Sequence, residues 1–162
     1  MKNLQRISHL LLASLLLMTA GVPLLGAPLA YAFPNTSSLL VPVDGTVDGT
    51  FEPVFLTGRI HVVTHQLLPS DPVRLDFNLV DVHGVGLSTG ARYVANGAAQ
   101  ITLPAAPVDP IRLLFPFVPV DPAFPGGRTL VNFLQATVAL TFSVDTGLLT
   151  GATAFFSTPL TE

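Results

Sequence analysis

The sequence predicts an all-β fold, an antiparallel β-sandwich or small barrel of about 7–9 strands. Three observations predict this class. Residues 33–162 are rich in Val, Leu, Phe and Thr, which favour strands. Several short stretches alternate apolar and polar side chains with a period of two. Clusters of Gly, Pro, Asp and Ser separate these stretches, as turn residues do in sandwiches and barrels.

The first 32 residues are predicted to be a secretory signal peptide. Lys2 and Arg6 precede an apolar run, Leu10–Met18, and the small residues Ala30 and Ala32 follow. The apolar run is shorter than the roughly 20 residues that a membrane-spanning helix needs. We therefore expect cleavage after Ala32 and one β-sandwich domain over residues 33–162. This domain is expected to be secreted, periplasmic or extracellular, with no membrane span after cleavage.

The charge balance and the missing cysteines exclude several classes of protein. Residues 33–162 contain five arginines and no lysine against ten carboxylates, a net charge near −5. Without clustered cations, neither nucleic-acid binding nor attraction to an anionic membrane surface is expected. The absence of cysteine excludes a disulfide scaffold, a thiol enzyme and an iron–sulfur protein, and no cofactor is predicted. The signal and the cysteine-free composition favour a bacterial source.

The start of the domain contains tight-turn signals. Residues 33–38 are predicted to be a loose N-terminus, and the dipeptides Asp44-Gly45 and Asp48-Gly49 are predicted turns. A calcium site is the alternative interpretation of two Asp-Gly pairs. Their spacing fits neither the EF-hand loop nor the nonapeptide calcium repeat, so turns are favoured.

The clearest structural signal is a hairpin of residues 58–68 and 72–79. Both stretches alternate, with apolar side chains on one face and polar ones on the other. A four-residue connection would place Leu68 opposite Val73 and His65 opposite Asp76. The alternation changes phase after Leu79, which predicts a bulge or the end of the strand. Further strands are predicted over residues 91–96, 98–103, 128–144 and 148–157.

A proline-rich loop is predicted over residues 104–127. Prolines occupy every third position from Pro104 to Pro125 except position 113, and the sequence Pro-Val-Asp-Pro occurs twice. Polyproline II has this period, but a continuous helix of this kind would be longer than the domain. We expect a folded-over loop or an edge strand, stiffened by proline, with residues 111–118 packed on the core. Exposure of Leu114, Phe115 and Phe117 would instead indicate an interaction surface.

The sequence offers few candidate catalytic residues. Gly86–Gly90 matches the G-x-S-x-G nucleophile elbow around Ser88, but no histidine follows Ser88 in the chain, as that motif requires. The reverse chain order exists as His61 or His65, then Asp76, then Ser88. A plain glycine-rich turn is the favoured interpretation.

Metal binding is not predicted. On one strand, His61 and His65 would lie about 13 Å apart, which is too far to share an ion. A site would need one of them together with His83 and a carboxylate such as Asp76 or Asp81. Single histidines on the polar faces of strands are the favoured interpretation.

Three hypotheses of function follow. The favoured one is an exported, non-enzymatic surface, structural or binding module, whose partner would be an unidentified protein or a small apolar ligand. The second is a small extracytoplasmic hydrolase or metal-dependent enzyme that uses His61, His65, Asp76 or His83. The third is a carrier that holds an apolar molecule between its sheets or beneath the proline-rich segment. The sequence does not determine the oligomeric state.

Overall fold

The computed structural model describes residues 35–66, 71–121 and 131–160, all within one compact unit, Ala32–Glu162. These residues form eight strands and no helix, and every hydrogen-bonded pair of strands is antiparallel. The strands are β1 (Asn35–Asp48), β2 (Pro53–Gln66), β3 (Val73–Gly86), β4 (Arg92–Ala95), β5 (Ala98–Leu103), β6 (Ile111–Pro119), β7 (Asn132–Phe142) and β8 (Leu149–Ser157).

The strands form one sheet that is nearly closed into a barrel, which confirms the predicted fold class. The hydrogen-bonded order is β1-β2-β3-β4-β6-β7-β8, and β5 also pairs with β3. β4 and β5 pair with different stretches of β3, so the two short strands share one position in the sheet.

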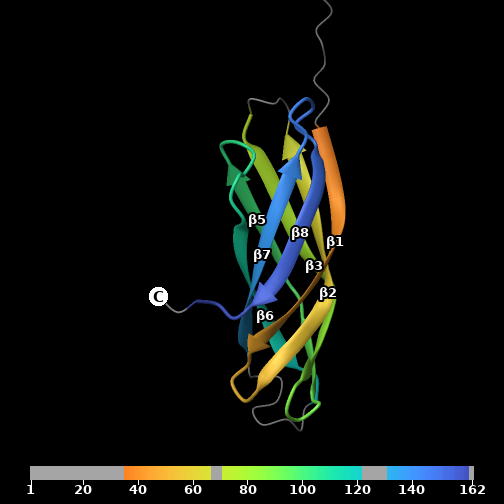
Figure 1. Cartoon of the computed structure of the whole chain (residues 1–162), viewed down its shortest axis with the longest axis vertical. Coiled ribbons are helices and arrows are strands. Elements are labelled where there is room, and N and C mark those ends of the chain that lie inside the picture. Colours follow the sequence, from red (N-terminus) through yellow and green to blue (C-terminus); the bar gives the residue numbers. More distant parts are fainter. Residues whose placement is uncertain (1–34, 67–70, 122–130, 161–162) are drawn as a thin grey trace, which may run out of the picture. The chain divides into compact units, whose positions relative to one another are not determined.

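β1 and β8 lie side by side and run in the same direction (Figure 1). Side chains connect the two strands in the described part of the chain. The Leu149 amide donates to Ser37 Oγ (3.0 Å) near one end, and the Asp48 amide donates to Thr158 Oγ1 (2.9 Å) near the other.

The predicted turn at Asp44-Gly45 is wrong, because Gly45 lies inside β1. A Cβ atom at Gly45 would overlap the carbonyl group of Phe156 in β8. This position therefore needs glycine for the close approach of two strands rather than for a turn. The second Asp-Gly pair does end its strand: β1 stops at Asp48, and the Gly49 amide donates to the Glu52 carbonyl (3.0 Å).

The expected loose N-terminus is also partly corrected, because β1 already begins at Asn35. Ser37 explains why a polar stretch can form a strand here. Its Oγ shares a hydrogen bond with Thr64 Oγ1 on β2 (2.7 Å), in addition to the bond that it accepts from Leu149. Inward hydroxyl groups that bond to one another do not carry the penalty of an unpaired buried polar group.

Alternate residues of the strands fill the interior, as the periodicity predicts. The hairpin directs Ile60 and Val62 of β2, with Leu75 and Phe77 of β3, into the core. The irregularity expected after Leu79 is confirmed. The β2–β3 pairing shifts between Thr57 and Arg59, opposite Asp81, which has a positive φ of 52°. The largest fully buried side chains are Phe77, Phe115, Phe117, Leu56, Ile60, Leu75 and Leu134.

The predicted hairpin register is wrong by two residues. His65 lies opposite Arg74 instead of Asp76, and Val63 lies opposite Asp76. The expected partner of Val73, Leu68, lies outside the described residues. A shift of two residues leaves every side chain on its own face, so the hydrophobic pattern cannot detect it.

The predicted loop or edge strand is wrong for part of the proline-rich segment, which forms the central strand β6 and pairs with both β4 and β7. Its odd-numbered side chains Leu113, Phe115 and Phe117 are buried, as expected for residues packed on the core. Pro116 lies within the strand and faces Phe133 of β7. β4 pairs with β6 only from Phe117 onward, so the edge of β6 before that point is outside the β4 ladder, where proline is tolerated. Residues 122–127 lie outside the described part of the chain.

Candidate functional site

Polar side chains gather on the outer face of β1, β2, β3 and β5, which we call the polar platform. The register sets its members in three cross-strand rows. Outward-facing positions of neighbouring strands lie about 5 Å apart, so these side chains can interact across the sheet. The polar members are Thr36, His65, Arg74 and Thr102 in the first row, Ser38, Asp76 and Gln100 in the second, and His61 and Asn78 in the third.

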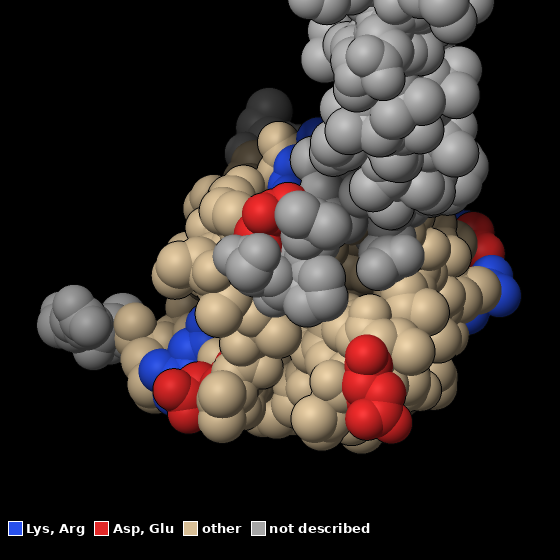
Figure 2. Space-filling model, turned by 90° about the horizontal axis from the view of Figure 1, so that it is seen from above, with Lys and Arg blue, Asp and Glu red and all other residues tan. Residues whose placement is uncertain are grey.

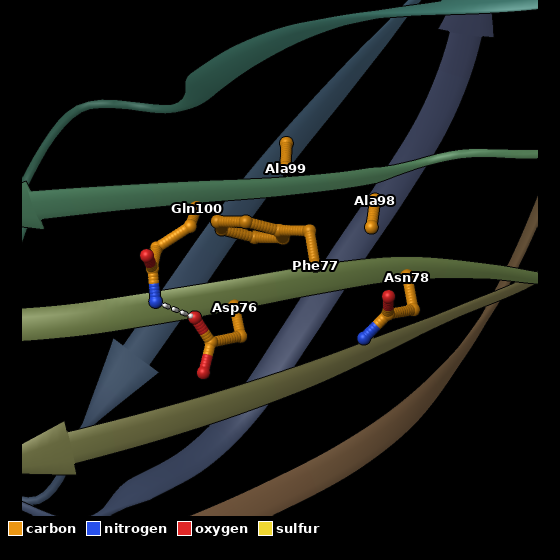
Figure 3. Close-up of a pocket in the computed structure, with 6 residues that line it drawn as sticks. All are labelled: Asp76, Phe77, Asn78, Ala98, Ala99 and Gln100. Atoms are coloured by element: carbon orange, nitrogen blue, oxygen red, sulfur yellow. Dashed lines mark hydrogen bonds between the residues drawn. The ribbon is translucent and has the colours of Figure 1, made fainter.

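Asp76 is the centre of the platform. Its Oδ2 accepts hydrogen bonds from His65 Nε2 (2.9 Å) and Arg74 Nη2 (3.2 Å), and its Oδ1 accepts one from Gln100 Nε2 (2.6 Å; Figure 3). Partial burial raises the pKa of this carboxyl, but the bond from Gln100 and the charge of Arg74 outweigh burial, so the pKa lies below its usual value. Asp76 therefore accepts three hydrogen bonds and cross-links three strands.

An open groove of about 370 Å³ lies beside Asp76 (Figure 3). Its lining offers amide and carboxylate groups but no hydroxyl or thiol that could act as a nucleophile. The lining residues are Asp76, Phe77, Asn78, Ala98, Ala99 and Gln100.

The structure does not assemble the candidate catalytic triad. His65 and Asp76 are bonded, and His61 lies two rows from His65 on the same face. Ser88 follows the opposite end of β3. Ten residue steps separate Asp76 from Gly86, which corresponds to roughly 33 Å along a strand. A serine at that distance cannot share a substrate with the His65–Asp76 pair.

The G-x-S-x-G stretch instead holds a buried carboxylate, Glu52, which sequence reasoning missed. Glu52 is only 4% exposed. It accepts hydrogen bonds from the amides of Ser88 (2.9 Å) and Thr89 (2.8 Å), from Thr89 Oγ1 (2.5 Å) and from the Tyr93 hydroxyl (3.3 Å). A Cβ atom at Gly86 would overlap this carboxylate. The glycine-rich loop is therefore shaped to receive Glu52.

The electrostatics of this cluster agree with its geometry. The hydrogen bond from the Thr89 hydroxyl, together with the loop amides, outweighs desolvation and lowers the pKa of Glu52. Burial, followed by the nearby Glu52 charge, raises the pKa of Tyr93 to about 12. No sequence motif marks Glu52, because its partners are 36 to 41 residues away.

The candidate metal ligands His83 and Asp81 are engaged with each other and with Arg59. His83 Nδ1 donates to the backbone carbonyl of Asp81 (3.0 Å), and the Asp81 carboxylate accepts from Arg59 Nη2 (2.6 Å). Among the residues that the structure describes, no three His, Cys, Asp or Glu side chains gather as a metal site would require.

Two of the three residues considered for an interaction surface are in the core. Phe115 and Phe117 are each 1% exposed, whereas Leu114, on the opposite face of β6, is 60% exposed. Phe133 of β7 and Phe155 of β8 are exposed on the same side of the sheet, at 53% and 52%. We call Leu114, Pro116, Phe133 and Phe155 the apolar face.

The apolar face is almost free of charge. Its rows place Phe133 beside Pro116, Leu114 beside Gln135, and Phe155 beside Thr137. Arg112, opposite Thr137, is the one charged residue at its margin on β6. Figure 2 shows one end of the molecule, where separate acidic and basic groups lie on a surface that is otherwise neither acidic nor basic.

Comparisons with family models, with curated proteins and with solved structures give no significant match for this chain. Within the described residues, no helix is both long and apolar enough to cross a membrane.

Replacing Asp76 with a neutral residue is expected to lower the free energy of unfolding at neutral pH but not at acidic pH. Because its pKa is lower in the folded chain than in the unfolded one, Asp76 stabilises the fold at neutral pH, and this contribution is lost as the pH falls below about 4. Asp76→Asn should therefore lower the free energy of unfolding by about 1 kcal/mol at neutral pH. Urea unfolding across this pH range measures the difference, and a difference that persists at the lowest pH would contradict this account of the cluster.

Proposed function

We propose that the chain is exported by residues 1–32 and that its β-domain acts outside the cytoplasm as a non-enzymatic binding module. In this proposal the apolar face contacts a partner protein. The observation that carries it is the exposure of Leu114, Phe133 and Phe155 on three neighbouring strands. Exposed apolar side chains gathered on one side of a domain are typical of an interaction surface.

The carboxylates Asp76, Glu52 and Asp81 support the same proposal, because each already has partners within the chain. Asp76 accepts three hydrogen bonds from its own chain, Glu52 is buried in its loop, and Asp81 is paired with Arg59. Carboxylates that already have good partners stabilise a fold but are poorly placed to bind a substrate. The four members of the apolar face are uncharged, which fits a protein surface of similar character.

A small hydrolase is the second candidate. The hydrogen bond between His65 and Asp76 beside an open groove is the observation that favours it, because an Asp that orients a His is part of many hydrolytic sites. This candidate requires a nucleophile or an activated water at His65. If ester hydrolysis by the purified chain were abolished by His65→Gln, the hydrolase would replace the binding module as the better proposal.

Photo-crosslinking tests the proposed face. A photoreactive phenylalanine analogue replaces Phe133 in one sample and Thr102, an exposed residue of the polar platform, in the other. Both chains are expressed in full in a bacterium that exports them. We expect protein adducts predominantly from position 133. Equal adduct yields from the two positions, or a higher yield from position 102, would contradict the proposal.

A further inference from the structure

A second groove, unrelated to the polar platform, lies on the outer face of β3 and β4. It has a volume of about 350 Å³. Val120, which follows β6 in the proline-rich segment, closes one side, and its amide donates to the Arg92 carbonyl (2.8 Å). The lining consists of His83, Gly84, Val85, Arg92, Tyr93, Val94 and Val120.

The floor of this groove is apolar. Val85 of β3 is 47% exposed and faces Arg92 across the strands, while Val94 of β4 faces His83. The apolar floor extends in two directions, because Val94 also pairs with Val118 of β6 and Val85 pairs with the exposed Phe55 of β2. Tyr93 points its hydroxyl toward Glu52, so the surface between the two strands is formed mainly by valine side chains.

The charge of the groove has one sign. Arg92 is its one permanently charged residue, and no carboxylate is among the residues that line it. Arg92 forms no salt bridge with any residue that the structure describes. The carboxylate of Asp81, two residues before His83, is already bonded to Arg59. An apolar hollow with a single cation at its rim is complementary to a molecule that is apolar along its length and anionic at one end.

We propose that this groove binds a small amphipathic anion. An alkyl chain or aromatic ring lies over Val85, Val94 and Val120, and the carboxylate, sulfate or sulfonate group at its end pairs with the Arg92 guanidinium. The volume is at the lower end of the range of ligand pockets, which suits one chain and not a large lipid. None of the residues that line the groove belongs to the apolar face, so each proposal can fail without the other.

Calorimetric titration of the purified chain with decanoate tests this site, with decanol as the neutral ligand of the same length. Decanoate is expected to bind in a saturable way and about tenfold more tightly than decanol, because only decanoate can form a charge-assisted bond to Arg92. Arg92→Gln should remove that tenfold advantage. Val94→Glu, which places a carboxylate on the floor, should abolish decanoate binding. All variants keep residues 1–34, so any contribution from them is common to all samples.

Arg112→Gln is the matched control. Arg112 is also an exposed strand arginine beside apolar side chains, but it lines neither groove. Its replacement should leave decanoate affinity unchanged, and circular dichroism checks that each variant is folded. The proposal is overturned if decanoate does not saturate, if Arg92→Gln has no effect, or if Arg112→Gln has the larger effect. Binding to anionic phospholipid vesicles without binding of free decanoate would also overturn it.

Discussion

Alanine in place of Phe115 is expected to lower the free energy of unfolding by about 3–5 kcal/mol, the range for a large side chain removed from a packed core. Phe115 is 1% exposed, and its ring lies so close to Gly97 that a Cβ atom there would overlap it. Its neighbour Leu114 points outward, and Leu114→Ala should change stability by no more than about 0.5 kcal/mol.

Denaturant unfolding of the two variants measures this difference. The pair is informative because the two residues are adjacent in the segment for which exposure of both side chains would have indicated an interaction surface. If both variants lost a similar amount of unfolding free energy, residues 111–119 would not form a strand with one buried and one exposed face.

Glutamine in place of Glu52 is expected to release the Gly86–Gly90 loop and to change the titration of Tyr93. Without the negative charge, the pKa of Tyr93 should fall from about 12 toward 10, while remaining above 10 because the ring is still buried. The amides of Ser88 and Thr89 should exchange with solvent faster, because both lose a charged acceptor. A raised tyrosine pKa stabilises the fold below pH 10, and this contribution is lost as the pH rises toward 12.

Tyrosinate absorbance measures the Tyr93 pKa directly, because the chain has no tryptophan and only one other tyrosine. That residue, Tyr31, is present in both proteins and contributes equally to the two titrations. Asp145→Asn, in the turn before β8, removes a carboxylate that is not near Tyr93 in the fold and serves as the control. An unchanged Tyr93 titration in Glu52→Gln would show that the cluster is not formed as described.

The period-two pattern predicted most of the fold, because it reports which side chains face the core. It located the hairpin faces and the bulge after Leu79 without any long-range information. It could not determine the register of β2 against β3. Pairings that differ by two residues bury the same side chains, so His65 could be placed opposite either Arg74 or Asp76.

Features that depend on contacts between distant residues were not predictable. Gly45 in an Asp-Gly pair indicates a turn locally, and only the approach of Phe156 explains its place in a strand. The same is true of Ser37, whose partners lie on β2 and β8, and of Glu52, which has no motif around it. In each case a residue far along the chain decides the structure.

The candidate site was predictable only in part. The bonded pair of His65 and Asp76 was expected, and it forms diagonally across the sheet in spite of the wrong register. Phe133 and Phe155 were not identified as surface residues. The presence of an aromatic residue in a strand does not by itself show whether that residue is buried or exposed. The packing of the neighbouring strands decides which face is buried.

The most direct test of the binding-module proposal uses the photoreactive analogue at position 133 in three backgrounds: the otherwise unchanged chain, Phe155→Ser and Asp76→Asn. Phe155→Ser removes an apolar group from the same face, and Asp76→Asn alters the polar platform on β3. We predict that the yield of protein adducts falls severalfold with Phe155→Ser and is unchanged with Asp76→Asn. Loss of the adducts with Asp76→Asn and their retention with Phe155→Ser would contradict a module that binds through its apolar face.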